Sequence, residues 1–500
     1  MPHYLSPEEL RRTAPAETAA FPAPVPTQIV SNGEFNPLPQ TPEQRRVEAR
    51  VKALADQLAP RHGLDRRRFL ASAAGMAAAF LAMNDVFGRV FEVSPAEAAQ
   101  PGVAAARAEA LAGQFIVDCQ THFVRDDFHQ TGLLDLAKYA KQHWNPALAG
   151  ENSLARFKFE NYVKEVFVDS DTKVALLSGA PFDDPTWNLL TNDQIAAARA
   201  AINRIAGSRR LLAHAVFTPG KPGWMDEVDR AIAQLRPDSW KGYTIGDPLF
   251  PSRLGSYWRL DDEKLVYPFY EKIARAGITT VCIHKGLLPA DYEKSWPGVW
   301  EYATVNDLGK AARDWPQISF VIYHAALRAF LEPPDAALAE FEQTGRIKWA
   351  TDLAEIPARY GVGNVYAEIG TAFANSAVAN PRFAAALLGT LIRGLGADHV
   401  IWGTDSVWYG SPQWQIEALR RLEIPEAMRR QHGFAPLGPA DGLVKTAIFS
   451  GNAARLYRLD LKAAQGEITG DQIAAIRAEY VASGGRRTNR RYGYVHRAAS

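Results

Sequence analysis

The sequence predicts an α/β fold in which eight parallel strands, each followed by a helix, close into a barrel. Two observations support this prediction: from residue 114 onward short apolar segments alternate with amphipathic helical segments, and several apolar segments end in a polar side chain able to bind a metal. Apolar strands that alternate with helices are typical of parallel βα units, and eight such units close a barrel. The polar strand ends are therefore expected to meet at one mouth of the barrel.

Eight segments have the length and composition of buried strands. They are residues 115–122, 173–178, 211–217, 240–244, 278–284, 318–324, 364–369 and 400–405. Helical periodicity fills most of the gaps, over residues 193–206, 225–235, 263–276, 305–314, 382–395 and 412–422. Gly207, Gly277 and Gly396 stand just after helical segments, where a glycine cap is expected.

Length and composition favour one large catalytic domain that acts on a small molecule. The chain has 500 residues, of which 47% are hydrophobic, and a barrel routinely uses more than about 200 residues as one domain. The 56 basic and 55 acidic residues nearly cancel, which argues against a nucleic-acid-binding protein. The two cysteines, Cys119 and Cys282, provide neither a disulfide framework nor a CxxC zinc motif. A metal site would therefore have to use histidine and carboxylate side chains.

The N-terminal part of the chain contains features of an export signal. Residues 1–64 are predicted to form a disordered arm, which is rich in proline between residues 14 and 41. Residues 65–99 begin with Asp-Arg-Arg-Arg-Phe-Leu, which resembles a twin-arginine signal. An Ala-rich apolar run at 71–83 and small residues near position 99 would suit the signal core and its cleavage site. The run is too short for a stable membrane span.

Two interpretations of residues 65–99 stay open. As a signal, the segment would engage the twin-arginine export machinery, which carries folded proteins, and the enzyme would be periplasmic or otherwise exported. As a helix retained in the mature protein, it would leave the enzyme in the cytoplasm. A long stretch of chain precedes the arginine pair and Asp85 closely follows the apolar run, and both features favour the retained helix.

Two further segments lie outside the regular βα alternation. The stretch 125–169 after the first strand contains Trp144, Phe157, Phe159 and Tyr162. It is predicted either to cap the barrel mouth, where long loops build specificity, or to serve packing and oligomerisation. The barrel itself is expected to span residues 114–460, and residues 461–500 to form a C-terminal helix and a basic tail.

Five polar residues at strand ends are the candidate site. They are Gln120, His122, His284, His324 and Asp405. A single histidine in an apolar strand is more often a hydrogen-bonded core residue than a ligand, but three histidines and an aspartate at strand ends favour one shared metal site.

Strand alternation adds a prediction about which side chains of the first strand face the site. Residues two apart in a strand share a face, so Asp118, Gln120 and His122 are expected to point together, and Cys119 and Thr121 to point away. Asp118 lies one step deeper, where a structural hydrogen bond and a catalytic role are both open.

These residues carry a resemblance to a known family. The motifs are Val-Asp-Cys-Gln-Thr-His-Phe at 117–123, His284, His324, Gly-Thr-Asp-Ser at 403–406 and Ser-Gly-Asn-Ala-Ala-Arg-Leu-Tyr at 450–457. In this order they are similar to the amidohydrolase superfamily, in its amidohydrolase-related (type 2) branch of metal-dependent hydrolases and decarboxylases. The resemblance covers residues 114–460 and implies a TIM barrel.

The resemblance also implies roles for the site residues. The first strand would supply two ligands, His284 another, and Asp405 would ligate the metal and contact the attacking water. His324 would act on the substrate as acid, base or polarising group. Gln120 departs from the family's His-x-His pattern, because an amide oxygen is a weaker, neutral donor. One divalent ion is expected, zinc in the first place and manganese as the harder alternative.

Three more residues are candidates for contacts with the substrate or with the ligands. Lys241, near the end of the fourth strand, is predicted to contact a substrate carboxylate or to form a structural ion pair. Glu368, at the end of the seventh strand, is predicted to orient an imidazole as a hydrogen-bond acceptor. Trp408, after the eighth strand, is predicted to line an apolar pocket.

The sequence thus predicts a metal-dependent hydrolase that acts on an ester, lactone or amide bond of a small carboxylated compound. Non-oxidative decarboxylation or hydration at the same site is the enzymatic alternative. A metal-free barrel acting as a binding protein is the non-enzymatic alternative, and Gln120 alone favours it. The family resemblance makes a homodimer the expected assembly.

Overall fold

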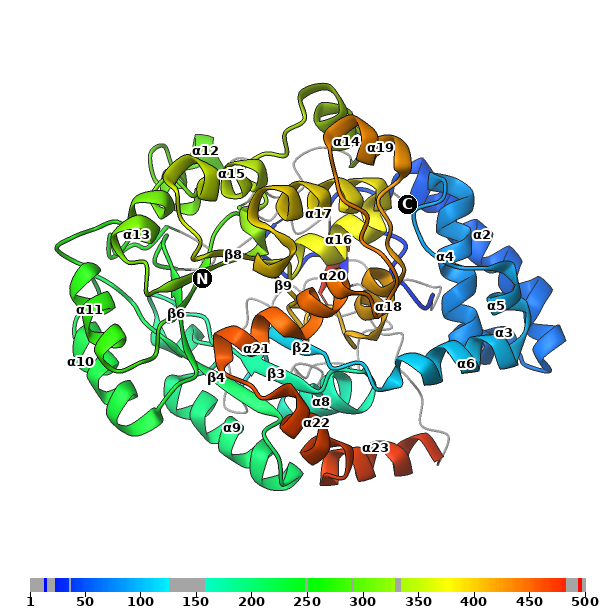
Figure 1. The fold of residues 1–500 in the computed structure, drawn as a ribbon, viewed down its shortest axis with the longest axis horizontal. Helices are drawn as coiled ribbons and strands as arrows, with labels where there is room; N and C mark the ends of the chain where they lie inside the picture. The colour runs from blue at the N-terminus through cyan, green and yellow to red at the C-terminus, as the bar shows by residue number, and fades with distance from the viewer. Residues whose placement is uncertain are drawn as a thin grey trace.

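A barrel of eight parallel strands lies at the centre of the computed structural model (Figure 1). The structure describes residues 13–15, 23–35, 37–125, 158–247, 251–288, 292–328, 334–482 and 493–496. The strands are β2 (Val117–Thr121), β3 (Val174–Leu177), β4 (Leu211–Val216), β5 (Ser239–Tyr243), β6 (Thr280–His284), β7 (Ser319–Tyr323), β8 (Val365–Glu368) and β9 (Val400–Ile401). They pair in chain order, so the predicted fold class and all eight predicted strands are confirmed.

Backbone hydrogen bonds between β2 and the segment after β9 close the ring. The amide of Cys119 donates to the carbonyl of Trp402 at 3.0 Å, and the amide of Asp405 donates to the carbonyl of Gln120 at 2.9 Å. A parallel bridge between Thr121 and Ser406 continues this contact. The last strand is only two residues long, but the chain beyond it stays beside β2 and carries Asp405 to the mouth.

Helices cover the outside of the barrel, and the predicted ones are present. They are α9 (Asn192–Ala206), α10 (Trp224–Arg230), α11 (Tyr267–Arg275), α13 (Leu308–Asp314), α17 (Pro381–Leu395) and α18 (Gln413–Arg421). The sequence prediction missed α14 (Pro334–Thr344), α15 (Ala350–Tyr360) and α16 (Ala372–Ala379). Gly207 ends α9 in the left-handed conformation with φ 76°, as expected for a glycine cap.

Apolar side chains from six strands fill the barrel interior below the mouth. This cluster includes Val117, Cys119, Val174, Leu176, Leu212, Cys282, Val321, Tyr323 and Ile401. The expected alternation along β2 fails here, because the pairing with β3 shifts register between Asp118 and Thr121. Cys119 therefore packs inside the barrel, while the carboxylate of Asp118 accepts a hydrogen bond from the amide of Thr404 at 3.0 Å. Asp118 has the structural role that the sequence left open.

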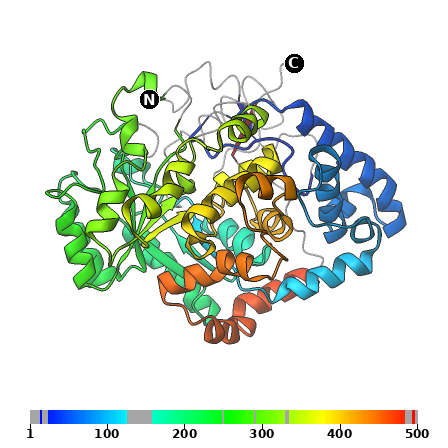
Figure 2. The same ribbon diagram turned by 45° about the horizontal axis from the view of Figure 1, so that its top comes forward.

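The N-terminal residues form a helical layer on one side of the barrel, on the right in Figures 1 and 2. It contains α2 (Pro42–Leu58), α3 (Arg66–Leu70), α4 (Ala73–Phe87), α5 (Pro95–Ala99) and α6 (Pro101–Ala112). The structure differs from the expected disordered arm at 1–64, since α2 is a capped helix that packs against α4. Most of the residues 1–22 of that arm lie outside the described residues, apart from a three-residue strand.

Helix α4 holds the apolar run that resembles a signal core. Its buried side chains include Ala77, Ala78 and Phe80, and it packs against α2, α5, α6 and barrel helix α17. No helix among the described residues combines the length and apolar character needed to span a bilayer.

The C-terminal residues form two helices where one was expected. After α21 (Asn452–Tyr457) the chain continues as α22 (Leu461–Thr469) and α23 (Gln472–Ala482). Strand β10 (Tyr494–His496) then pairs antiparallel with β1 (Thr13–Pro15). The predicted basic tail falls mainly on residues outside those described.

Only part of the expected cap after β2 belongs to the described residues. Trp144 and Phe157 lie outside them. Phe159 and Tyr162, in helix α8 (Phe159–Val163), pack against Phe123 with ring centroids 5.5 and 5.2 Å apart. Tyr162 also hydrogen bonds to Thr121 at 2.8 Å. This helix therefore packs beside the end of β2.

Candidate metal centre

The predicted site residues do meet at the carboxyl ends of the strands. Gln120 Nε2 lies 3.0 Å from Asp405 Oδ1 and 3.3 Å from His324 Nε2. His122 Nε2 lies 3.2 Å from the same Asp405 oxygen. The imidazole rings of His284 and His324 are in edge contact, with centroids 4.7 Å apart. All five side chains are buried.

His122 is held so that one ring nitrogen faces Asp405. Its Nδ1 lies 3.0 Å from the backbone carbonyl of Ser178, which can only accept, so Nδ1 carries a proton. The 3.2 Å contact between Nε2 and Asp405 Oδ1 then requires positive charge, since two lone pairs would otherwise face each other. A proton on Nε2 gives an imidazolium–carboxylate pair, and a divalent cation could replace that proton.

His324 presents its imidazole in the same way. Its Nδ1 lies 2.9 Å from the carbonyl of Gly370, so Nδ1 is the protonated nitrogen and Nε2 points into the site. Burial is the largest influence on the ring and lowers the pKa of His324 to about 4. His324 is therefore a neutral imidazole near pH 7, and its unprotonated Nε2 accepts a hydrogen bond from the Gln120 amide at 3.3 Å.

Asp405 is the anionic centre of the site. Burial alone would raise the pKa of Asp405, but the neighbouring His122 and the hydroxyl of Thr371 outweigh it and keep this pKa below its usual value. Thr371 donates to Oδ2 at 2.7 Å and Asn32 donates to the same oxygen at 3.0 Å. Because Oδ2 is held by these two donors, Oδ1 faces the imidazole of His122.

His284 lies on the opposite side of the site. Its ring stacks on Tyr243 with centroids 4.9 Å apart, and burial lowers the pKa of His284 well below its usual value. Its Nδ1 has no hydrogen-bond partner among the described residues. The nearest carboxylate is Glu34, whose Oε1 is 3.6 Å from that nitrogen.

Gln120 turns its amide nitrogen toward the site. Nε2 donates to Asp405, while the buried Oε1 has no hydrogen-bond partner among the described residues. Amide nitrogen and oxygen are assigned from their hydrogen bonds. To act as a ligand, the side chain would have to rotate by half a turn and bring Oε1 to the place of Nε2.

The donor set fits a divalent cation. Neighbouring donor atoms of an ion with bonds of about 2.1 Å are about 3 Å apart, close to the 3.2 Å between Asp405 Oδ1 and His122 Nε2. Ligand atoms of Glu34, His284 and His324 also lie within 4.8 Å of one another. Two imidazoles oriented by backbone carbonyls are a common feature around protein-bound metals.

Several non-glycine residues at the strand ends have positive φ angles. The φ angles are 59° at His324, 57° at Thr371 and 57° at Asp405. This conformation costs about 1 to 2 kcal/mol per residue, and such outliers concentrate at functional sites. The conformation of His324 is held by Glu368, whose Oε2 accepts a hydrogen bond from the His324 amide at 3.2 Å.

Glu368 differs from its prediction, and Lys241 lacks one of the two contacts predicted for it. Among the described residues, the hydrogen bonds that Glu368 accepts come from the amides of His324 and Gly370, and burial raises the pKa of Glu368 to about 8. Lys241 forms no ion pair with a described residue, and its buried Nζ has no hydrogen-bond partner. The ammonium instead lies 3.3 Å from the centroid of the Tyr323 ring.

Trp408 is buried beside the site. Its ring centroid lies 6.2 Å from that of His122, and its amide donates to the carbonyl of Asp405 at 3.3 Å.

The sequence reasoning missed three residues that belong to the site. Thr371 follows β8, and Asn32 and Glu34 come from the Pro-rich N-terminal region. An available signal was the Asn32-Gly33 pair between apolar Val30 and Phe35, since Asn-Gly favours a turn and apolar flanks anchor it.

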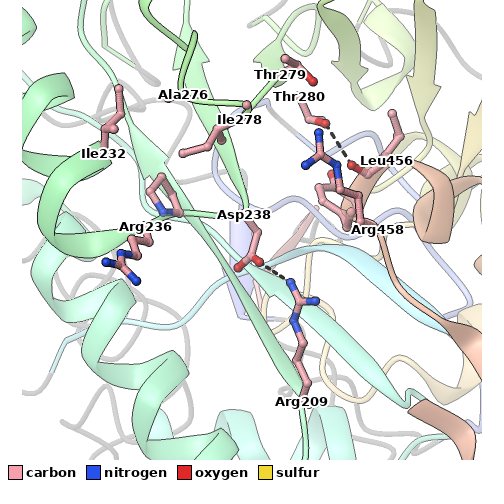
Figure 3. A pocket seen from close by; sticks show the side chains of 13 residues that line it. Arg209, Ile232, Arg236, Asp238, Ala276, Ile278, Thr279, Thr280, Leu456 and Arg458 are labelled. Atoms are coloured by element: carbon pink, nitrogen blue, oxygen red, sulfur yellow. Dashed lines mark hydrogen bonds and ion pairs between the residues drawn. The ribbon is translucent and has the colours of Figure 1, made fainter. Parts of the chain in front are cut away.

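A surface pocket lies at the opposite end of the barrel. Its lining comes from residues at the amino ends of β4, β5 and β6 and from the end of α21, including Arg209, Asp238, Thr280 and Arg458 (Figure 3). Arg209 is paired there with Asp238 at 2.5 Å. Because the site residues follow the carboxyl ends of the strands, this pocket is separate from the candidate metal centre.

Fold and site together define a barrel with a candidate metal centre at its carboxyl mouth. The family model described as Amidohydrolase matches residues 117–459. The chain therefore belongs to this family of metal-dependent enzymes, in its amidohydrolase-related (type 2) branch. The resemblance stated from the sequence motifs is confirmed. A search of curated proteins finds no match.

Solved structures with a related barrel are distant. They include 5-carboxyvanillate decarboxylase from Sphingomonas paucimobilis, with 16% identity over 69% of this chain and 99% of that one and a TM-score of 0.40. The same-named enzyme from Novosphingobium aromaticivorans, solved with manganese, has 14% identity over 70% and 97% and a TM-score of 0.38. A Pseudomonas putida protein described as a 2-pyrone-4,6-dicarboxylic acid hydrolase has 13% identity over 70% and 99% and a TM-score of 0.34.

Proposed function

We propose that the chain is a metal-dependent hydrolase that cleaves an ester, lactone or amide bond of a small carboxylated compound. The observation that carries the proposal is the contact of His122 Nε2 with the Asp405 carboxylate at 3.2 Å, which requires a proton or a cation between two groups of metal-ligand type. When bound, a divalent ion lowers the pKa of a coordinated water and polarises a substrate oxygen. Zinc is the expected ion, and manganese is the alternative.

His122, His284 and Asp405 would hold the ion, and Asp405 also acts as the base. Its carboxylate is ionised near pH 7, because its pKa lies below the usual value. Thr371 and Asn32 fix Oδ2 by hydrogen bonds, so Oδ1 would face the ion, and the carboxylate would accept the proton of the attacking water.

His324 serves as an acid only after it has gained a proton. Its Nδ1 proton is hydrogen bonded to the carbonyl of Gly370, and its Nε2 is unprotonated. In the resting state His324 therefore has no proton to donate to a substrate oxygen. It would take over at Nε2 the proton that Asp405 receives from the water and would pass it to the leaving group.

Lys241 would recognise the carboxylate of the substrate or stabilise negative charge near it. A buried ammonium without a hydrogen-bond partner is costly, and Lys241 Nζ is such a group. Burial lowers the pKa of Lys241 to about 8, so its charged form still predominates at pH 7.

Non-oxidative decarboxylation is the second candidate, and a buried aromatic ring at the mouth favours it. A substrate carboxylate placed beside Tyr243, which is buried and stacks on His284, would lose much of its hydration. Loss of water from a carboxylate favours its departure as carbon dioxide.

Metal analysis combined with one variant tests the proposal. We expect about one divalent ion per purified chain, and Asp405→Asn should reduce turnover by about 10² to 10⁴-fold while thermal unfolding shows an intact fold. Acid release from carboxylated lactones and aryl esters, measured beside carbon dioxide release from aromatic acids, separates the two reactions. If the purified protein holds no ion and is not activated by added zinc or manganese, both the hydrolase and the decarboxylase proposals are contradicted.

A further inference from the structure

The N-terminal segment 23–35 lies across the barrel mouth and is anchored there. Ala23, Val25, Ile29, Val30 and Phe35 are buried. The amide of Val30 donates to the side chain of Asn375, which follows β8, at 3.0 Å. The segment thus has its own apolar anchors and a specific hydrogen bond to the barrel.

A tight turn within this segment points Glu34 into the mouth. Asn32 Oδ1 accepts the amide of Glu34 at 3.1 Å, and Gly33 between them has φ 104°, a conformation that favours glycine. Asn32 Nδ2 donates to Glu34 Oε2 at 2.7 Å and to Asp405 Oδ2 at 3.0 Å. One amide group therefore bridges the carboxylates of Glu34 and Asp405.

Glu34 faces the two imidazoles on the side of the site away from His122. Its Oε1 lies 3.6 Å from His284 Nδ1, which has no hydrogen-bond partner among the described residues. The ligand atoms of Glu34, His284 and His324 lie within 4.8 Å of one another. The side chain of Glu34 is 12% exposed, so most of the carboxylate is withdrawn from water.

One of the metal-ligand positions of the barrel is occupied by a poor ligand, and the carboxylate of Glu34 could compensate for it. Gln120 provides a neutral amide whose nitrogen, not oxygen, faces Asp405. The carboxylates of Glu34 and Asp405 repel each other when both are ionised, and a divalent cation between them would remove that repulsion. The bridging amide of Asn32 is a neutral donor, so it reduces the repulsion between the two carboxylates only in part.

We propose that Glu34 is a ligand of the metal ion, so that an oxygen donor from outside the barrel compensates for the amide at Gln120. This inference rests on the proposed function, because it requires a metal ion at the mouth. Carboxylate oxygen suits harder ions, so Glu34 shifts the relative affinity of the site from zinc toward manganese.

The experiment compares the metal-binding properties of full-length Glu34→Gln with those of the unaltered chain. The Gln side chain keeps the shape and can still accept from Asn32, but it removes the charge. We expect manganese affinity, measured by competition with a chelator, to fall at least about ten-fold, and zinc affinity to fall less. The relaxation rate of water protons in the manganese-loaded protein should rise, because water takes the place of the lost ligand.

Glu43→Gln is the matched control, since Glu43 lies at the start of α2 and pairs only with Arg46 among the described residues. It should leave affinity and relaxation unchanged, and thermal unfolding of both metal-free variants should show intact folds. If Glu34→Gln binds manganese as tightly as the unaltered chain, with the same relaxation rate, the inference is wrong although the metal site stands. If the unaltered chain binds neither metal, the proposed function fails instead. Should Glu34→Gln misfold, Glu34→Asp provides the comparison, with weaker manganese binding expected and unchanged binding contradicting the ligand role.

Discussion

Gln120 is the residue at which this chain departs most clearly from the metal-ligand pattern its motifs imply. Its amide nitrogen donates to Asp405 and lies 3.3 Å from His324 Nε2. In the metal-free state this donor relieves the negative charge of Asp405, which an imidazole with its lone pair toward the site would not do. Gln120 therefore stabilises the metal-free protein, but its amide is a weaker metal ligand than an imidazole or a carboxylate.

Gln120→Glu tests this balance, because the two side chains have nearly the same shape. The new carboxylate would face Asp405 in place of a hydrogen-bond donor, so the metal-free melting temperature should fall. Manganese affinity should rise by about ten-fold, since an anionic oxygen replaces a neutral amide. Thermal melts with and without manganese measure both effects, and Gln120→Ala controls for the loss of the amide. An unchanged response to manganese would exclude position 120 from the ligand set.

At the scale of elements, a buried ion pair fastens the C-terminal helices to the barrel. Asp471, just before α23, accepts hydrogen bonds from Arg210 at 2.6 and 2.8 Å and from Ser208 at 2.6 Å. Arg210 directly precedes β4, and both charged side chains are nearly inaccessible to water. Burial tends to raise the pKa of Asp471, but the hydrogen bonds from Arg210 and Ser208 outweigh it and lower the pKa below its usual value.

Asp471→Asn should destabilise the fold by about 3 kcal/mol at pH 7, because it leaves a buried arginine without its charge partner. A carboxylate with a lowered pKa contributes stability above its unfolded pKa and loses that contribution as the pH falls through its folded pKa. The difference between variant and unaltered chain should therefore shrink below about pH 4. Urea unfolding at pH 7 and at acidic pH measures this, with exposed Glu467→Gln on α22 as control. An equal difference at both pH values would exclude the carboxylate charge as its cause.

At the scale of the whole molecule, the N-terminal layer is joined to the barrel by its backbone. The amide of Glu92 donates to the carbonyl of Arg421, and the amide of Glu423 to that of Val90, both at 2.7 Å. A bridge between Phe91 and Leu422 lies between them. The guanidinium of Arg421 also pairs with the buried carboxylate of Glu97 at 3.0 Å. Residues that follow α4 thus belong to the packed structure.

The packed position of α4 and the export prediction imply different N-termini for the mature protein. The intact mass of the protein distinguishes between them. Removal of the segment up to residue 99 would uncover apolar surface on α17 and would also remove Asn32 from Asp405. We therefore expect the intact mass of the active protein, isolated from its native cells, to include residues 23–99. A mature chain that begins near residue 100, recovered from the periplasm, would support the twin-arginine signal and overturn this expectation.

The sequence was informative where a local pattern determines the structure. The eight strands could be predicted because each is a short apolar run flanked by turn residues, and Asp405 could be placed because it follows such a run. The side-chain directions in β2 could not, since the register shift between Asp118 and Thr121 depends on pairing with β3. The hydrogen bonds of Glu368 differ from the predicted ones. The positive φ of His324 accompanies a turn that brings its backbone amide, rather than an imidazole, to the Glu368 carboxylate.

Contacts between distant parts of the chain were beyond such reasoning. Proline-rich sequence predicts disorder from composition, yet the segment around Asn32 and Glu34 is anchored by a few apolar side chains whose partners lie hundreds of residues away. Val30 and Asn375, for example, are 345 residues apart in the sequence. No local pattern specifies such a pairing.

The location of Asn32 shows that the site extends beyond the part of the chain that matches the family. Inherited similarity ends at residue 117 on the N-terminal side, but a hydrogen bond to the central carboxylate comes from residue 32. Substitutions in the N-terminal segment can therefore alter the chemistry of the mouth while every inherited barrel motif stays intact. Relatives of this chain could diverge in metal preference through a region that a comparison restricted to the shared barrel would never align.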